Sequence, residues 1–173
     1  YVDHVLVHTG QNYDYELNEI FFKELSVRKP DYFMNVDISS LGKVYGGVLE
    51  KAEELLLQEK PHAVLILGDT NSSIACIMAK RRKVPIYHME AGNRCFDQNV
   101  PEEINRKIID HISDFNLCYT EHARRNLISE GLPHRRTYVT GSPMREVLFT
   151  HMEKINASDA LQKLSLNRGE YFL

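Results

Sequence analysis

The chain has 173 residues, of which 43% are hydrophobic and 26% are charged, a balance that suits one ordinary globular domain with a substantial core. Its formal net charge of -3 gives no electrostatic sign of a nucleic-acid partner or of an anionic membrane surface. No apolar run reaches membrane-spanning length, and the three cysteines, Cys76, Cys95 and Cys118, show neither a close pair nor a metal-binding spacing. We therefore expect reduced thiols in a cytoplasmic protein.

Patterns typical of strands and of helices alternate along the chain. Short apolar runs bounded by turn residues predict strands at residues 5–8, 32–34, 63–67, 85–89, 115–119 and 137–140. Apolar side chains at helical spacing predict helices at residues 15–27, from about 40 onward, and at 71–80, 101–112, 121–129 and 143–164. This alternation favours an α/β fold with a doubly wound parallel sheet.

Both ends of the chain fall inside predicted strands. Residues 1–7 already have the pattern of a strand and include no initiator Met, and residues 169–173 have the pattern of a strand that is only beginning. We therefore interpret the chain as part of a longer protein.

Acidic side chains follow two of the predicted strands and open the next helix. Asp69 follows the strand at 63–67, Glu90 follows the strand at 85–89, and Glu102 lies in the first turn of a helix. In open α/β sheets, ligands bind at the carboxyl ends of the strands. A carboxylate there either caps a helix or acts as a general acid or base. Three of them at successive strand exits favour acid–base chemistry.

Each of the two strand-end carboxylates has a structural explanation as well as a functional one. Taken alone, Asp69 is better explained as a helix N-cap, a position at which Asp is favoured. Glu90 is followed by Ala-Gly rather than by a capping pattern, so it should project into the cleft above the sheet. Arg94 is either its ion-pair partner or a ligand for an anionic substrate. His88 points to the same face of its strand as Glu90 and is either a core histidine or a supporting residue of the site.

The helix that begins at Pro101 carries further polar candidates. A favourable interaction with the helix dipole, a surface effect of about 0.3–1 kcal/mol, would explain Glu102, and Glu103 would supply that effect equally well. Asn105 and Arg106 lie on the same helical face as Glu102. That face suits the recognition of a polar ligand, and it equally suits an exposed ion pair.

Several cofactor and nucleophile motifs are absent from the sequence. No G-x-G-x-x-G follows a strand, and there is no G-x-x-x-x-G-K-[ST] phosphate loop, no G-x-S-x-G turn and no H-E-x-x-H pair. The sequence assigns no base to Cys95, so a small buried thiol is the better explanation for it. We therefore expect neither a metal nor an organic cofactor.

Four short motifs resemble those of one enzyme family in their order and spacing. They are Gly68–Thr70, His88–Arg94, Pro101–Arg106 and Thr140–Pro143. Together they resemble the non-hydrolysing UDP-N-acetylglucosamine 2-epimerases. The resemblance implies the first half of a GT-B-type enzyme, in which two Rossmann-like domains enclose the active site. On this expectation, residues 1–142 form the N-terminal domain without its first strand. Residues 143–168 form the linking helices, and residues 169–173 are the start of the second domain.

The resemblance also implies a reaction and a set of residues. Members of this family invert C2 of a UDP-linked N-acetylhexosamine by eliminating UDP and adding it back, without a metal or a cofactor. The acid–base roles then belong to Asp69, Glu90 and Glu102. The substrate contacts belong to Gln11, His88, Arg94, Asn105 and Arg106. The product would be a precursor of surface polysaccharides, and we expect a cytoplasmic homodimer without nucleic-acid or membrane partners.

Details of the resemblance bear on the sugar and on regulation. Residues 93–98 look most like the branch that acts on UDP-linked N-acetylated 6-deoxy-L-sugars, so such a sugar stands beside UDP-N-acetylglucosamine as the expected substrate. Some bacterial members have a regulatory UDP-sugar site; residues 38–41 lack its Gln, although Gln11 matches, so allosteric activation is not implied. Two other classes stay open, a GT-B glycosyltransferase and a non-catalytic nucleotide-sugar-binding domain.

Overall fold

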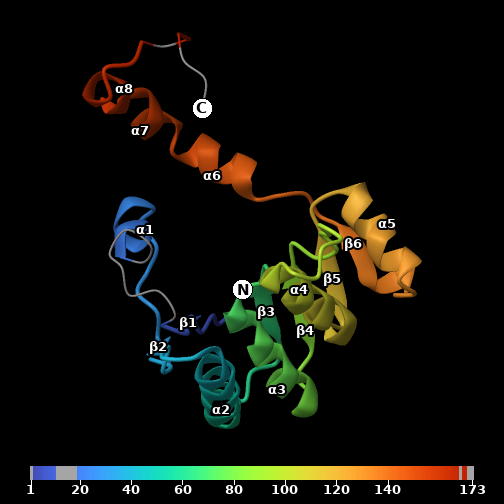
Figure 1. Ribbon diagram of the computed structural model, residues 1–173. Coiled ribbons are helices and arrows are strands. Elements are labelled where there is room, and N and C mark those ends of the chain that lie inside the picture. Colours follow the sequence, from blue (N-terminus) through green and yellow to red (C-terminus); the bar gives the residue numbers. More distant parts are fainter. Residues whose placement is uncertain (1, 11–18, 168, 171–173) are drawn as a thin grey trace. The chain divides into compact units, whose positions relative to one another are not determined.

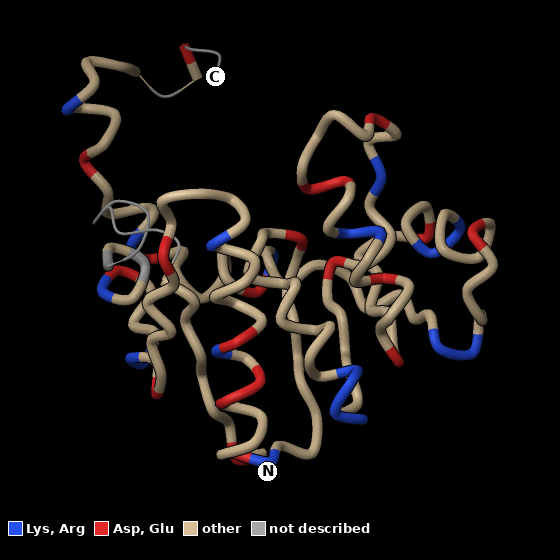
Figure 2. Tube along the Cα trace, turned by 60° about the horizontal axis from the view of Figure 1, so that its bottom comes forward, with Lys and Arg blue, Asp and Glu red and all other residues tan. Residues whose placement is uncertain are grey.

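A computed structural model of the chain describes residues 2–10, 19–167, 169 and 170 (Figure 1). Its internal contacts divide the chain into two compact units, Tyr1–Thr140 and Gly141–Leu173. Within the described ranges, no helix has the length and apolar character needed to cross a bilayer. Acidic and basic residues are interspersed along the trace (Figure 2).

All described strands of the first unit run parallel, which confirms the α/β class. The strands β1 (Val7–His8) and β2 (Tyr32–Phe33) form a two-stranded sheet. A second sheet has the order β3-β4-β5-β6 and contains β3 (Val64–Leu67), β4 (Ile86–Met89), β5 (Phe115–Cys118) and β6 (Thr137–Val139). The described strands thus occupy two sheets, because β1 and β2 pair only with each other among them.

Helices connect these strands close to the predicted positions. They are α1 (Glu19–Glu24), α2 (Leu41–Glu59), the 3₁₀ helices η2 (Asn71–Ala75) and η3 (His134–Arg136), α3 (Cys76–Arg81), α4 (Pro101–Ile112) and α5 (Glu121–Ser129). Ser40 caps α2 by accepting a hydrogen bond from the Lys43 amide, and Thr120 caps α5 in the same way. The helix predicted at 71–80 begins as a 3₁₀ turn, and part of the helix predicted at 15–27 lies outside the described residues.

Buried apolar side chains attach α3, α4 and α5 to one face of the four-stranded sheet. Ile86 of β4 packs with Cys76 of α3 and Ile109 of α4, and all three residues are fully buried. A second cluster joins Cys118 of β5 to Leu127 of α5. These contacts pack the last turns of α4 against the start of β4.

The opposite face of the same sheet is apolar and partly exposed. Leu65 and Leu67 of β3 are 64% and 60% exposed, and Tyr138 of β6 is 48% exposed. Between them, the rings of Tyr87 and Phe115 are stacked with centroids 4.7 Å apart. The helices of the first unit that bury side chains against this sheet therefore do so on its other face.

The second unit contains short helices only. The helical pattern predicted for residues 143–164 forms α6 (Met144–Thr150), α7 (Met152–Asn156) and α8 (Ala160–Lys163). None of their described residues is buried. The pattern is helical as predicted, but it is interrupted, since His151 and Asp159 leave the helical conformation at the start of α7 and α8.

Candidate functional site

The carboxyl ends of β3 and β4 place Asp69 and Glu90 on adjacent turns. The two strands are in register from Val64 to Leu67, and the Gly68 amide then donates to the Met89 carbonyl at 3.1 Å. A Cβ built on Gly68 would lie 3.4 Å from the Glu90 Oε2 atom, so the Glu90 carboxylate reaches across to the turn that carries Asp69. The structure therefore brings these two predicted residues together at one edge of the sheet.

Asp69 forms a paired contact with Arg106 of α4. The guanidinium Nε and Nη2 atoms both lie 2.8 Å from Asp69 Oδ2, and Nη1 lies 3.0 Å from Glu103 Oε2. The N-cap residue of η2 is Thr70, and no side chain caps this helix. Helix capping by Asp69, the better explanation on sequence grounds, is therefore wrong, because its carboxylate is turned toward a cation on a neighbouring helix.

Glu90 is half-buried on a strained backbone. Its φ of 66° lies in the left-handed region, which disfavours any residue with a Cβ. Its carboxylate Oε1 accepts one hydrogen bond, from Asn93 Nδ2 at 3.3 Å. Strain of this kind, on the order of 1–3 kcal/mol, persists where surrounding contacts enforce it and is found most often at functional sites.

Tyr119 is a neighbour of Glu90 that sequence reasoning missed. It follows β5 at the same edge of the sheet and is half-buried. Burial, and then the negative charge of Glu90, raise the pKa of the Tyr119 hydroxyl. The sequence placed Tyr119 as the last residue of the strand predicted at 115–119, and a strand that ends at Cys118, as β5 does, puts it at the same position as Glu90 after β4.

The adjacent glutamates at the start of α4 have opposite environments. Glu102 is exposed, and no hydrogen bond or ion pair joins its carboxylate to any residue that the structure describes. Glu103 is fully buried and accepts hydrogen bonds from the amides of Cys95 and Phe96 at 3.1 and 3.3 Å. Glu103 is thus an acidic residue in the first turn of α4, as expected, and it also holds the preceding loop.

The contacts of Glu103 also explain its charge and the state of Cys95. Burial raises the pKa of Glu103, but hydrogen bonds from Cys95 and the charges of Arg106 and Lys107 outweigh it, so the pKa lies below its ordinary value. The Cys95 Sγ atom lies 3.4 Å from Glu103 Oε2. Cys95 is exposed, so the expectation of a buried thiol at this position is wrong. Cys76 and Cys118 are buried free thiols.

A buried network lies behind Glu90 and is centred on Asp110, in the last turns of α4. His88 Nδ1 lies 2.9 Å from Asp110 Oδ1, and His88 Nε2 lies 3.0 Å from the Gly68 carbonyl oxygen. Arg94 Nη1 donates to Asp110 Oδ2 at 2.7 Å, and the Gly92 amide donates to both carboxylate oxygens at 3.2 and 3.3 Å. Asp110 was not among the residues singled out from the sequence.

Arg94 is a buried structural cation in this arrangement. Its side chain is fully buried, and it also donates to the two Glu130 carboxylate oxygens at 2.7 and 2.6 Å. Burial lowers the pKa of Arg94, but the hydrogen bonds that it donates to Glu130 and Asp110 and the charges of these carboxylates outweigh this effect and raise it overall. The ion pair expected between Arg94 and Glu90 is replaced by pairs with Asp110 and Glu130.

Asn105 lies in a second buried network, which joins three helices. It is 1% exposed, accepts a hydrogen bond from the Tyr45 hydroxyl of α2 at 2.7 Å, and donates to Asn71 Oδ1 of η2 at 3.0 Å. Asp69, Glu90 and Arg106 thus meet at the edge of the sheet, while Asn105 lies behind them. Gln11, the remaining predicted contact, lies outside the described residues.

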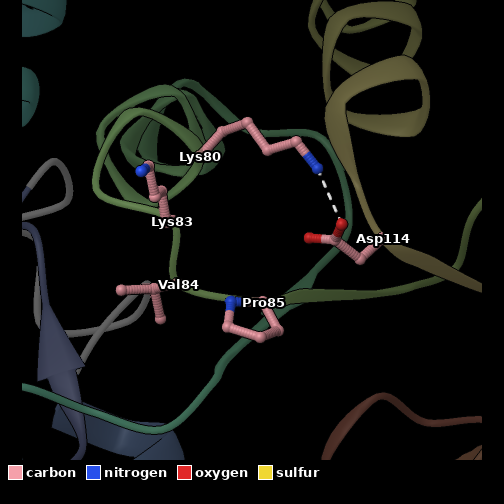
Figure 3. A pocket seen from close by; sticks show the side chains of 5 residues that line it. All are labelled: Lys80, Lys83, Val84, Pro85 and Asp114. Carbon is pink, nitrogen blue, oxygen red and sulfur yellow. Dashed lines mark hydrogen bonds and ion pairs between the residues drawn. The ribbon is translucent and has the colours of Figure 1, made fainter.

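The opposite edge of the four-stranded sheet has a small pocket (Figure 3). It is lined by Lys80, Lys83, Val84, Pro85 and Asp114, which precede β4 and β5. Lys80 Nζ donates to Asp114 Oδ1 at 2.7 Å, and the Ile86 amide donates to Oδ2 at 3.0 Å. None of the predicted site residues lines this pocket. In the described part of the chain, no cluster of three His, Cys, Asp or Glu side chains is arranged to hold a metal ion.

Comparison with known proteins identifies relatives along the whole chain. The model of the UDP-N-acetylglucosamine 2-epimerase family matches residues 1–173. A UDP-N-acetylglucosamine 2-epimerase homolog of Methanococcus maripaludis is 40% identical over 99% of this chain and 48% of its own length. The UDP-2,3-diacetamido-2,3-dideoxy-D-glucuronate 2-epimerase of Pseudomonas aeruginosa is 44% identical over 76% of this chain and 37% of its own length.

Solved structures give the same assignment. The UDP-N-acetylglucosamine 2-epimerase of Rickettsia bellii superimposes with a TM-score of 0.89 at 62% identity, over 96% of this chain and 45% of that one. The Methanocaldococcus jannaschii enzyme in complex with UDP-GlcNAc and UDP has a TM-score of 0.88 at 34% identity, over 94% and 45% of the two chains. The chain therefore spans about half the length of the relatives it matches.

Proposed function

We propose that this chain, which belongs to the UDP-N-acetylglucosamine 2-epimerase family, supplies the acid–base wall of an active site that inverts C2 of a UDP-N-acetylhexosamine. The observation that carries the proposal is the adjacency of Asp69 and Glu90 at the carboxyl edge of the sheet, with Glu90 held on a left-handed backbone. Residues at the carboxyl ends of parallel strands lie where an α/β sheet binds its ligand, so they can act there as acids and bases.

The chemistry explains why more than one carboxylate is needed. The proton on C2 of the sugar is not acidic, so a base removes it while the bond from C1 to the UDP oxygen breaks and its electron pair leaves with UDP. The resulting 2-acetamidoglycal then takes UDP back at C1 and a proton at C2 from the opposite face. Two acid–base groups on opposite faces of the sugar are therefore required, each able to exchange a proton near neutral pH.

The described contacts suggest how the roles divide among the three carboxylates. The Glu90 carboxylate accepts one hydrogen bond, from the Asn93 side chain, and has no ion pair with any described residue, so it is freer than Asp69 to exchange a proton with a sugar. Asp69 is oriented by the two contacts from Arg106. Glu102 is exposed at the start of α4 and is available to a ligand from the solvent side.

The remaining parts of the proposal concern the longer protein. Residues 1–142 would form most of its N-terminal Rossmann-like domain, 143–168 the connection, and 169–173 the start of a second domain that holds most of the nucleotide. The substrate would be UDP-N-acetylglucosamine or a UDP-linked N-acetylated 6-deoxy-L-sugar. The residues that contact it or support its binding site would be Gln11, His88, Arg94, Asn105 and Arg106. The protein would act as a cytoplasmic homodimer and supply a precursor of surface polysaccharides.

A substrate panel with the full-length gene product tests this function. The protein is incubated with each UDP-sugar alone, and the products are followed by proton NMR. We expect a C2 epimer with UDP still attached. A requirement for an acceptor sugar would instead identify a glycosyltransferase, and release of UDP in proportion to product would identify a hydrolysing enzyme. Binding without turnover of any sugar would leave only a nucleotide-sugar-binding domain and would overturn the proposal.

A further inference from the structure

The Asp110 carboxylate forms hydrogen bonds with several residues of one short segment, residues 88–94. It is fully buried and has contacts with His88, Gly92 and Arg94, at 2.7 to 3.3 Å. These three residues flank Glu90 on both sides along the chain. Among the residues that the structure describes, no hydrogen bond or ion pair joins Asp110 to Asp69, Glu90 or Glu102.

The segment held in this way contains two left-handed residues. Glu90 has a φ of 66° and Gly92 has a φ of 81°. A Cβ on Gly92 would lie 2.3 Å from the Ala123 carbonyl oxygen of α5, so the backbone passes there too closely for any other residue. A turn with this much strain keeps one conformation only if several contacts enforce it. The two hydrogen bonds from the Gly92 amide to Asp110 are contacts of that kind.

The same carboxylate also reaches the turn that carries Asp69. His88 lies between Asp110 and the Gly68 carbonyl oxygen, with one ring nitrogen facing each. His88 therefore bridges the buried carboxylate to the backbone of the Asp69 turn. Arg94, whose side chain is fully buried, pairs with the same carboxylate and also with Glu130, whose side chain is 26% exposed.

We propose that Asp110 is the positioning residue that holds Glu90 and the Asp69 turn in their reactive geometry. It acts through His88, Gly92 and Arg94 and does not touch the sugar. The inference rests on the proposed function, since it assigns a role in supporting that site. Misplacement of a reacting group by about 1 Å can lower a rate by about 100-fold, so loss of this support should affect turnover more than substrate binding.

Two substitutions separate support by hydrogen bonds from simple stability. Asp110→Ala removes every acceptor. Asp110→Asn can keep the geometry, because its amide oxygen can accept from Gly92 and Arg94 while its amide nitrogen donates to His88 Nδ1. The matched control is Ile109→Ala, which removes a fully buried apolar side chain from the same helix without touching the segment.

The experiment measures kcat and KM of the full-length variants on the UDP-sugar that the wild type converts. We expect kcat of Asp110→Ala to fall by about 100-fold with KM changed by less than about threefold, Asp110→Asn to retain kcat within about tenfold, and Ile109→Ala to retain it within about threefold. Wild-type kcat in Asp110→Ala would overturn the inference. An equal loss in Asp110→Asn and in Ile109→Ala would also overturn it, because a general loss of stability would then explain the data.

Two spectroscopic readouts judge the inference without any turnover. The nitrogen NMR signal of His88 Nδ1 should differ between the wild type and Asp110→Asn, because an amide replaces the carboxylate oxygen that it faces, and this comparison remains informative even if Asp110→Ala does not fold. Hydrogen exchange of residues 89–93 should be faster by about tenfold or more in Asp110→Ala than in Ile109→Ala. An unchanged Nδ1 signal in Asp110→Asn, or unchanged exchange in Asp110→Ala, would contradict the positioning role. An inactive wild type with both expected signatures would instead overturn only the proposed reaction.

Discussion

The two edges of the four-stranded sheet carry ion pairs of equal length in very different surroundings. At the amino edge, Lys80 and Asp114 are 2.7 Å apart, with side chains 43% and 24% exposed. At the carboxyl edge, Arg94 and Asp110 are also 2.7 Å apart, and both side chains are fully buried. Water screens the first pair, whereas loss of Arg94 would leave the fully buried Asp110 carboxylate without its arginine partner. Burial, and not distance, decides which edge is held rigidly.

The difference matches the use that we propose for each edge. The buried pair belongs to a network that holds His88, Gly92 and the left-handed Glu90. At the exposed pair, Asp114 holds the backbone of Ile86 alone, since its carboxylate accepts from the Ile86 amide and its own amide donates to the Ile86 carbonyl. Catalytic geometry has to be maintained within fractions of an ångström. The carboxyl edge is built for that requirement, and the amino edge is a surface ion pair.

The largest expected effect is on turnover at the carboxyl edge. Glu90→Gln keeps the shape of the side chain and removes its ability to exchange a proton, so kcat should fall by about 10²- to 10⁴-fold. The measurement is the rate of epimer formation by the full-length protein, with far-ultraviolet circular dichroism as the check on folding. Retention of wild-type kcat would remove Glu90 from the acid–base machinery.

The next effect is on stability and concerns the buried pair. Arg94→Ala leaves Asp110 and Glu130 without their shared cation, so the free energy of unfolding should fall by about 3–5 kcal/mol. Urea unfolding followed by fluorescence measures the change, with Lys80→Ala as the matched control, since it also removes the cation from an aspartate at 2.7 Å. Equal losses in the two variants would contradict the comparison of the edges.

A pH effect is expected from Glu103, which supports the loop before α4. Its pKa is lowered in the folded state, so its stabilisation is complete above the ordinary value of 4.5 and is lost as the pH falls through the lower folded value. Glu103→Gln should therefore be less stable than the wild type at neutral pH, and the difference should shrink below about pH 4.5. Urea unfolding at a series of pH values measures it. A difference that grew on acidification would mean that the pKa is raised.

The smallest expected effect is at the amino edge. Lys80→Ala should change the free energy of unfolding by no more than about 1 kcal/mol, because an exposed pair gains little over hydration. Its kcat should equal that of the wild type, since the pocket that Lys80 lines contains none of the candidate site residues. Steady-state kinetics and urea unfolding on the same sample test both statements. A large loss of activity would show that the amino edge takes part in the reaction.

The sequence predicted the α/β class and the strand-end positions of the carboxylates because these depend on local alternation. It did not predict which face of α4 is buried. Ile104 of this helix is 50% exposed, whereas Glu103 and Asp110 are fully buried. Glu103 and Asp110 are two turns apart and share one face. That face is polar because it meets the strained turn at Gly92, a tertiary relation that no local pattern records.

The direct test of the account is the fate of the C2 proton. The full-length protein is incubated with the UDP-sugar that it epimerises in deuterium oxide, and the product is examined by proton NMR. Removal of the C2 proton by a carboxylate and its return from solvent predict an epimer that carries deuterium at C2, formed by the wild type and lost in Glu90→Gln. An epimer that keeps its original C2 proton would contradict the elimination chemistry and the role of this carboxyl edge.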